Sequence, residues 1–337
     1  MYNKTYIINQ LGDIKMNFTK LDNGQYDGFA IIKKYDKKIS SKGSAYLDII
    51  LADKTGEISA KKWTVTSLDE TLTADMIVKV RGEMEIYNGR EQFKILQMRL
   101  TADSDKVKMN DLIPCSPYAG EKMYNDIYNL VSAFKDKDLS GIVLETLKVN
   151  KEKLIYYPAA LRLHHAINGG LLYHTLSIVR MAEKVADIYP SIDKELLLSG
   201  AILHDIAKTW ELEVANTGIA KGYTAEGELI GHLVKGAINL EIFGQKLGTD
   251  REKLTLLQHM VLSHHGQPDF GAAVRPMFLE AEILSVLDNL DATIFEFNNA
   301  VSKVEPGAFS DRQWALDNRK LYNHARTNTE HFAKLDD

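Results

Sequence analysis

The chain has 337 residues, of which 45% are hydrophobic and 26% charged, a composition typical of a globular protein long enough for two domains. Its single cysteine, Cys115, excludes an internal disulfide and a zinc site of clustered thiolates, and suits a reducing cytoplasm. The net charge of −5 does not indicate a nucleic-acid binder, and no apolar run approaches the roughly 18 residues of a membrane span.

Charge is distributed unevenly along the chain. Residues 1–100 contain 16 Lys and Arg against 13 Asp and Glu, whereas the remainder contains 25 against 33. Five lysines gather between residues 33 and 42. Such a cluster is more often a solvated surface than a binding patch, so composition alone leaves its role open. We expect residues 1–20 to form a leader.

Alternating apolar and polar residues predict β-strands in the first third of the chain. Residues 45–53, AYLDIILAD, alternate in this way. Residues 76–100 indicate two strands joined at Asn88 and Gly89, a strong signal for a two-residue hairpin turn. Because an OB-fold has five short strands, we predict a small all-β OB-fold barrel over residues 21–100.

Three aromatic residues of this region, Tyr46, Trp63 and Tyr87, are candidates for contact with nucleic acid. On the open face of an OB-fold, aromatic side chains stack on unpaired bases, and each contact is worth about 1–3 kcal/mol. The alternative is that Trp63 fills the interior of the barrel. Both possibilities remain open at this point.

The sequence pattern changes after residue 100. Residues 101–117 are polar and charged and include two prolines, which predicts a linker. From residue 118 to residue 317, successive segments carry apolar residues at helical spacing, which predicts an all-α helical bundle. Residues 318–337 form a polar tail that we expect to fray.

Eight of the ten histidines lie between residues 164 and 265, all in the predicted helical half. Taken singly, each is explained as a core histidine or as a residue at a helix C-terminus. Taken together, histidines and aspartates on the inward faces of separate helices need partners, because a buried polar group without one is costly. A divalent cation suits imidazole nitrogen and carboxylate oxygen. The candidate ligands are His174, His204, Asp205, His232, His264, His265 and Asp288.

Three segments of the helical half resemble a known family. They are HHAINGGLLYHTLSI (164–178), GAILHDIAK (200–208) and SHHGQPDFGAAVRPMFLEAEILSVLDNLDA (263–292). They resemble the HD-domain metal-dependent phosphohydrolases and, among these, the YhaM-type 3′→5′ exoribonucleases, which join an N-terminal OB-fold to a C-terminal HD domain. One departure is DFGAAVRP, where the family tends to show a Gly-Ser-Pro segment. The resemblance implies an HD domain over residues 118–317.

The resemblance also implies a metal centre and its chemistry. His174, His204, Asp205 and Asp288 would hold one divalent ion, and Asp205 would bridge to a second ion held by His232, His264 and His265. The family favours Mn²⁺, while the donor set also suits Fe²⁺, Co²⁺ or Zn²⁺. The implied reaction is 3′→5′ hydrolysis of single-stranded RNA, and possibly of DNA, to nucleoside monophosphates by a metal-activated hydroxide.

Further residues have candidate roles around this centre. Lys208 shares a helix face with His204 and is expected to contact a phosphate oxygen, with a solvent-facing position as the alternative. His164 and His165 are candidates for contact with the scissile phosphate or for proton donation, and structural capping is the alternative. Arg275 is a candidate phosphate contact. Asp291, one turn after Asp288, is expected to orient a ligand.

Two other functions are compatible with the sequence. One is an HD nucleotidase or phosphodiesterase acting on free nucleotides, with the β half as an interface in a homo-oligomer. The other is a non-catalytic regulator that binds nucleic acid. The complete set of candidate ligands argues against a decayed site. The predicted partner is single-stranded RNA or DNA, and no membrane association is expected.

Overall fold

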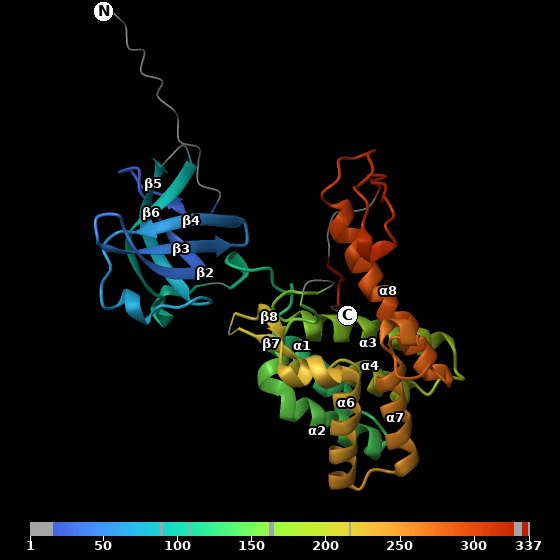
Figure 1. The fold of residues 1–337 in the computed structure, drawn as a ribbon. Helices are drawn as coiled ribbons and strands as arrows, with labels where there is room; N and C mark the ends of the chain where they lie inside the picture. The colour runs from blue at the N-terminus through green and yellow to red at the C-terminus, as the bar shows by residue number, and fades with distance from the viewer. Residues whose placement is uncertain are drawn as a thin grey trace, which may run out of the picture. The chain divides into compact units, whose positions relative to one another are not determined.

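The computed structural model describes residues 16–87, 90–107, 109–161, 165–215, 217–326 and 332–335. The chain forms two compact units, Met1–Pro114 and Cys115–Asp337, which Figure 1 shows as a β barrel and a helical bundle. The division falls inside the segment predicted as a linker. No helix in the described ranges is long and apolar enough to cross a membrane.

The first unit is a closed barrel. After the short β1 (Thr19–Lys20), its strands are β2 (Tyr26–Ile39), β3 (Ala45–Asp53), β4 (Gly56–Lys62), β5 (Ile77–Tyr87) and β6 (Arg90–Leu100). The strand order is β2-β3-β4-β6-β5, and β5 pairs again with β2. All pairs are antiparallel except β4 with β6. This five-stranded topology confirms the predicted OB-fold.

The 14-residue strand β2 closes the barrel because it pairs with two neighbours. Its first part pairs with β5 and its second with β3, and the register shifts between Ile32 and Lys34. Such an irregularity bends a strand, which lets β2 turn from one neighbour to the other. On β3, the alternating residues Leu47, Ile49 and Leu51 are buried, as the period-two pattern predicts. The predicted turn at Asn88 and Gly89 lies outside the described residues.

A buried ion pair holds the excursion between β4 and β5 in place. Lys62 Nζ lies 2.7 Å from Asp69 Oδ2, and both side chains are buried. The same oxygen accepts hydrogen bonds from the backbone N–H and the hydroxyl of Thr66, each at 2.7 Å. Burial opposes the charge on Asp69, but Lys62 and Thr66 together keep the pKa of its carboxyl below the usual range.

The second unit is a helical bundle, as predicted. Its helices are α1 (Gly120–Ser132), α2 (Lys137–Leu154), α3 (Gly170–Ile188), α4 (Lys194–Leu203), α5 (Lys208–Glu211), α6 (Ala225–Leu247), α7 (Arg251–Ser263) and α8 (Leu279–Val301). Side chains of Asp136, Asp193, Thr224 and Asp250 cap the starts of α2, α4, α6 and α7. The first ten residues of α3 are all buried, so α3 forms the centre of the bundle.

Two features of this unit differ from the expected pattern. A small hairpin, β7 (Leu212–Val214) with β8 (Ala220–Tyr223), follows α5 and was not predicted. The expectation that the tail frays is wrong for residues 332–335, because the N–H of Leu335 donates to the Tyr118 hydroxyl at 2.9 Å and the Leu335 side chain is buried.

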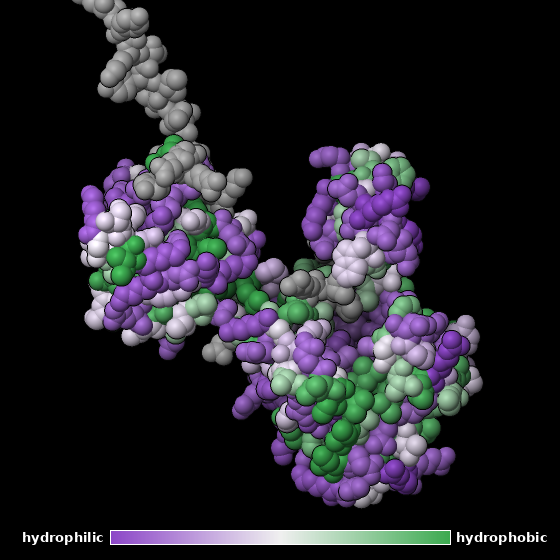
Figure 2. All heavy atoms as spheres, viewed as in Figure 1, coloured by the Kyte–Doolittle hydropathy of each residue, from purple (hydrophilic) through white to green (hydrophobic). Residues whose placement is uncertain are grey.

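Figure 2 shows apolar surface in the region of α6, where Val234, Ile238 and Ile242 are exposed at helical spacing.

Candidate metal centre

The seven candidate ligands meet in the bundle interior. His174 comes from α3, His232 from α6 and Asp288 from α8, while the other four directly follow α4 or α7. Their ligand atoms form overlapping groups in which all atoms lie within 4.8 Å of one another. These groups are His232 with His264 and His265, His174 with His204 and Asp205, and His204 with His264 and Asp288.

Asp205 lies between two sets of histidines. Its Oδ2 is 3.3 Å from Nε2 of His204 and 3.7 Å from Nε2 of His174. Its Oδ1 is 3.4 Å from Nε2 of His232 and 3.6 Å from Nε2 of His264. One carboxylate therefore offers a different oxygen to each set, the geometry required of a ligand that bridges two ions.

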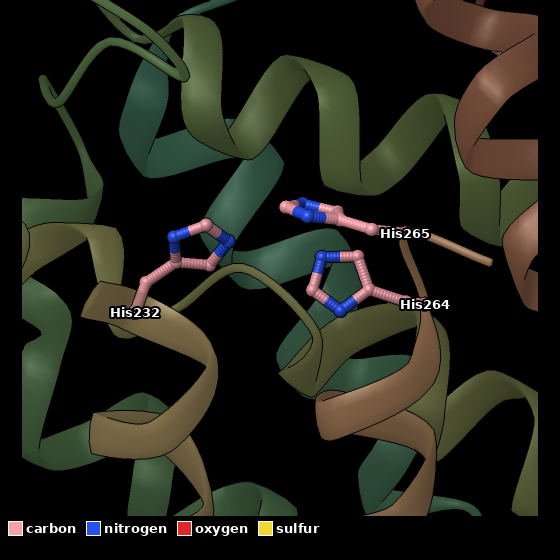
Figure 3. A group of neighbouring side chains, drawn as sticks. All are labelled: His232, His264 and His265. Carbon is pink, nitrogen blue, oxygen red and sulfur yellow. The ribbon is translucent and has the colours of Figure 1, made fainter. Parts of the chain in front are cut away.

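The remaining two ligands extend these two sets. Asp288 Oδ1 lies 3.1 Å from Nε2 of His174 and 4.0 Å from Nε2 of His204, on the Oδ2 side of Asp205. His265 groups with His232 and His264, and Figure 3 shows the three imidazole rings converging from α6 and the end of α7. The centre thus has two halves joined by one aspartate.

Hydrogen bonds at Nδ1 orient the histidines so that Nε2 faces the centre. Three rings donate Nδ1–H to backbone carbonyls, which leaves a lone pair on Nε2 for a metal ion. These pairs are His204 with Ala201 at 2.8 Å, His264 with Val261 at 2.8 Å and His265 with Phe270 at 3.0 Å.

The other two rings donate to carboxylates. His174 Nδ1 lies 2.7 Å from Asp291 Oδ2, the contact through which Asp291 would orient this ring. His232 Nδ1 lies 2.9 Å from Glu211 Oε1. The sequence did not predict Glu211 as a site residue, because its signal there is only its position three residues after Lys208, one helical turn along α5.

Three buried atoms at the centre test whether these residues fit a metal ion. Asp205 Oδ1, His232 Nε2 and His264 Nε2 have no hydrogen-bond partner within the described part of the chain. Leaving one such atom unsatisfied costs about 1–3 kcal/mol, so a site with three of them needs a ligand. A divalent cation with nitrogen and oxygen ligands meets that need, and the residues present fit it.

The pKa values of the histidines agree with cation binding. Burial and the neighbouring His264 lower the pKa of His265 to about 4, and burial lowers the pKa of His264 as well. Both rings are therefore neutral near pH 7 and able to bind a metal. Burial opposes a charge on His174, but Asp288 and Asp291 outweigh it and raise the pKa of His174 to about 10. A metal ion at Nε2 would take the place of that proton, and the same carboxylates would favour the bound cation.

Lys208 and His165 also lie at the centre. Lys208 Nζ is 2.6 Å from Asp205 Oδ2 and its side chain is 12% exposed, so the solvent-facing alternative is wrong. Burial opposes ionisation of Asp205, yet Lys208 and His204 hold the pKa of its carboxyl well below the usual range.

His165 is 2% exposed and its Nε2 lies 2.7 Å from Asp291 Oδ2. This position suits orientation of Asp291 better than contact with substrate.

The other candidate residues are not members of these groups of ligand atoms, or they lie outside the described residues. His164 and the side chain of Tyr87 are not described. Arg275 is exposed in the loop after His265.

In the barrel, Trp63 is 40% exposed, so the alternative that it fills the interior is wrong. Its ring lies 4.9 Å from that of Tyr46 at an angle of 30°. Lys61 Nζ lies over both rings, at 5.5 Å from Tyr46 and 5.7 Å from Trp63. The barrel therefore presents an aromatic pair with a cation beside it.

Comparisons with known proteins agree with this architecture. Residues 171–293, which include all seven candidate ligands, match the HD domain family. The 3'-5' exoribonuclease YhaM of Geobacillus sp. (strain WCH70) is 39% identical over 299 residues, covering 88% of this chain and 91% of that protein. The protein of the same name from Bacillus subtilis (strain 168) is 36% identical over 299 residues, covering 88% of this chain and 94% of that protein.

Among solved structures, a chain of a replication protein A heterotrimer bound to single-stranded DNA resembles part of this protein. The match is 18% identical, covers 25% of this chain and 62% of that chain, and has a TM-score of 0.21. The family of this chain follows from the two exoribonuclease matches, which are more than 30% identical and cover most of both chains. The chain belongs to the YhaM family of 3'-5' exoribonucleases and carries an HD domain in its helical unit.

Proposed function

We propose that this protein is a metal-dependent 3′→5′ exonuclease that hydrolyses single-stranded RNA to nucleoside monophosphates. The observation that carries this proposal is the position of Asp205, whose two oxygens face different histidine sets. Family membership supports the direction and the RNA substrate. Single-stranded DNA is a second substrate of the same chemistry, because hydrolysis at phosphorus needs no 2′-hydroxyl.

The centre is proposed to hold two divalent ions, preferably Mn²⁺. His174, His204 and Asp288 would hold one ion and His232, His264 and His265 the other, with Asp205 between them. Two ions about 3.5–4 Å apart activate water and neutralise charge on the phosphoryl group during in-line displacement. The mixed nitrogen and oxygen donors support a transition metal rather than Mg²⁺ or Ca²⁺.

Other side chains are proposed to position ligands and substrate. The Lys208 ammonium, which lies beside Asp205, would contact a non-bridging phosphate oxygen through a charge-assisted hydrogen bond. Asp291 fixes the tautomer of His174, and His165 in turn donates to Asp291. Arg275 would contact the RNA backbone from its exposed loop.

The barrel is proposed to bind the single strand upstream of the cleaved nucleotide. Trp63 and Tyr46 would stack on bases, and Lys61 would neutralise nearby phosphates. Stacking on an aromatic face tolerates any base, which suits an enzyme that removes successive nucleotides. Binding of this kind weakens as salt concentration rises.

The proposal is tested with 5′-end-labelled single-stranded RNA, Mn²⁺ and analysis of product length. We expect progressive shortening from the 3′ end with release of nucleoside monophosphates, and no hydrolysis by Asp205→Ala. Asp187→Ala is the matched control, since Asp187 pairs with Lys194 on the surface. Phosphate release from mononucleotides without shortening of RNA, or full activity of Asp205→Ala, would contradict the proposal.

A further inference from the structure

Helix α6 is interrupted immediately before His232. Gly231 has φ 73° and ψ 163°, a backbone conformation that is essentially confined to glycine. The helix therefore restarts at His232, whose backbone N–H stands at a new helix N-terminus and needs an acceptor. This break determines which way the His232 side chain leaves the helix.

A single carboxylate oxygen holds both the backbone and the ring of His232. Glu211 Oε1 lies 3.1 Å from the His232 backbone nitrogen and 2.9 Å from its Nδ1. The bond at Nδ1 fixes the tautomer with the proton on Nδ1, because in the other tautomer a lone pair on Nδ1 would face the carboxylate and be repelled by it. The ring then presents Nε2 to Asp205 Oδ1 at 3.4 Å.

Glu211 is itself held rigidly. It is the last residue of the four-residue helix α5, which begins with Lys208, and its side chain is 13% exposed. Its backbone carbonyl accepts the N–H of Thr224 at 2.9 Å. A Cβ at Gly227 would lie 2.3 Å from this carbonyl oxygen, so glycine there allows α6 to pack directly on Glu211.

The two halves of the centre are thus oriented by two separate carboxylates. Asp291 on α8 orients His174 in one half, and Glu211 on α5 orients His232 in the other. The remaining histidine ligands use backbone carbonyls, which side-chain substitution leaves in place. Each half therefore has one orienting side chain that can be changed by itself.

We infer that Glu211 is a positioning residue that controls occupancy of the ion held by His232, His264 and His265, without controlling the other ion. This inference rests on the proposed two-ion centre. Loss of a carboxylate that orients a metal-bound histidine weakens metal binding about 10–100-fold. Removing the carboxylate of Glu211 should therefore weaken binding of this one ion selectively.

The test measures metal content rather than activity. Wild type, Glu211→Ala, Glu211→Gln and Asp291→Ala are loaded with Mn²⁺ and dialysed against a series of free Mn²⁺ concentrations. Bound metal is counted by mass spectrometry, and electron paramagnetic resonance identifies exchange-coupled Mn²⁺ pairs. Glu211→Met, which keeps side-chain length without an acceptor, replaces the alanine variant if that variant does not fold.

We expect two ions per wild-type chain and a coupled spectrum. Glu211→Ala should keep one tight ion, lose the coupled spectrum and bind the second ion about 10–100-fold more weakly. Glu211→Gln should retain both ions, because its amide oxygen can accept the same bonds. Asp291→Ala should weaken binding of the ion held by His174, His204 and Asp288, while Glu211 and His232 remain paired.

Two results would overturn the inference. The first is wild-type binding of both ions by Glu211→Ala or Glu211→Met. The second is equal loss of both ions in Glu211→Ala, which would show that Glu211 acts on the whole centre and not on one ion. Fewer than two ions in the wild type would instead contradict the two-ion centre itself, so the two failures are distinguishable.

Discussion

Lys208 places its ammonium 2.6 Å from Asp205 Oδ2, on the same carboxylate that faces both sets of histidines. Because Lys208 is three residues from Asp205, the contact is made within one turn, and the positive charge is present at the centre in the folded chain. This position fits a contact with the phosphate of the substrate. The positive charge of Lys208 would also repel a cation bound at Asp205.

Substitution of Lys208 should separate these two effects. In Lys208→Ala we expect kcat/KM on RNA to fall about 10–150-fold, since a charge-assisted hydrogen bond is worth about 1.5–3 kcal/mol. Metal content should equal or exceed that of the wild type, because a neighbouring positive charge has been removed. Steady-state kinetics and metal analysis measure both. An unchanged rate would exclude a role for Lys208 in substrate binding.

Metal removal should destabilise the helical unit. Binding to the folded state alone adds about 2.7 kcal/mol at a concentration 100 times the dissociation constant. We therefore expect chelation to lower the Tm of this unit by roughly 5–10 °C, with recovery on addition of Mn²⁺. Scanning calorimetry of the full chain measures the shift. A Tm that is the same with chelator and with Mn²⁺ would argue against a metal centre.

The aromatic pair of the barrel should contribute to RNA affinity. Trp63→Ala should weaken binding of a long single strand by about 1–3 kcal/mol, or roughly 5–150-fold, through loss of base stacking. Hydrolysis of very short oligonucleotides should change little, because a strand of one or two nucleotides bound at the metal centre has no further base to stack on the aromatic pair. Fluorescence anisotropy at several salt concentrations measures the affinity. Ile39→Ala, another exposed apolar position on the barrel, is the control, and equal affinity of both variants would contradict the prediction.

The ion pair between Lys62 and Asp69 should make the barrel sensitive to acid. The folded pKa of Asp69 lies below its ordinary value, so its stabilisation is present above about pH 4 and is lost as the pH falls through the folded pKa. Asp69→Asn should cost about 3 kcal/mol at pH 7, because it leaves a buried ammonium unpaired. The difference from wild type should shrink in acid.

Urea unfolding at pH 7 and pH 3 measures this effect, with Trp63 fluorescence recorded in a Trp210→Phe, Trp314→Phe background. Asp48→Asn is the control, because Asp48 pairs with Lys38 at the surface and such pairs contribute at most about 1 kcal/mol. Equal losses for the buried and the surface substitution would show that the buried pair has no special role.

Local sequence patterns predicted the architecture well where one face of an element is buried. Alternation of Leu47, Ile49 and Leu51 predicted β3, and helical spacing around His174 predicted that its ring points inward. The candidate metal ligands could be grouped because they come from several separate helices or helix ends, and a buried imidazole needs a partner.

Features that depend on contacts between distant segments could not be predicted. Glu211 contacts His232 directly after Gly231 interrupts α6, and no local pattern indicates that conformation. Leu335 lies in a polar segment, yet its side chain belongs to the core of the bundle. The Tyr118 hydroxyl accepts the N–H of Leu335, and the Tyr173 hydroxyl donates to the carbonyl of Ala333. The identity of His165 as a partner of Asp291, across 126 residues, likewise required the fold.

Anomalous diffraction from crystals of the protein grown with Mn²⁺ tests the two-ion centre most directly. The two oxygens of Asp205 and the two histidine sets predict a pair of manganese peaks about 3.5–4 Å apart, one on each side of its carboxylate. Crystals of Asp205→Asn should lose at least one of them. A single peak, or manganese bound elsewhere with the seven side chains unchanged, would contradict the two-ion centre.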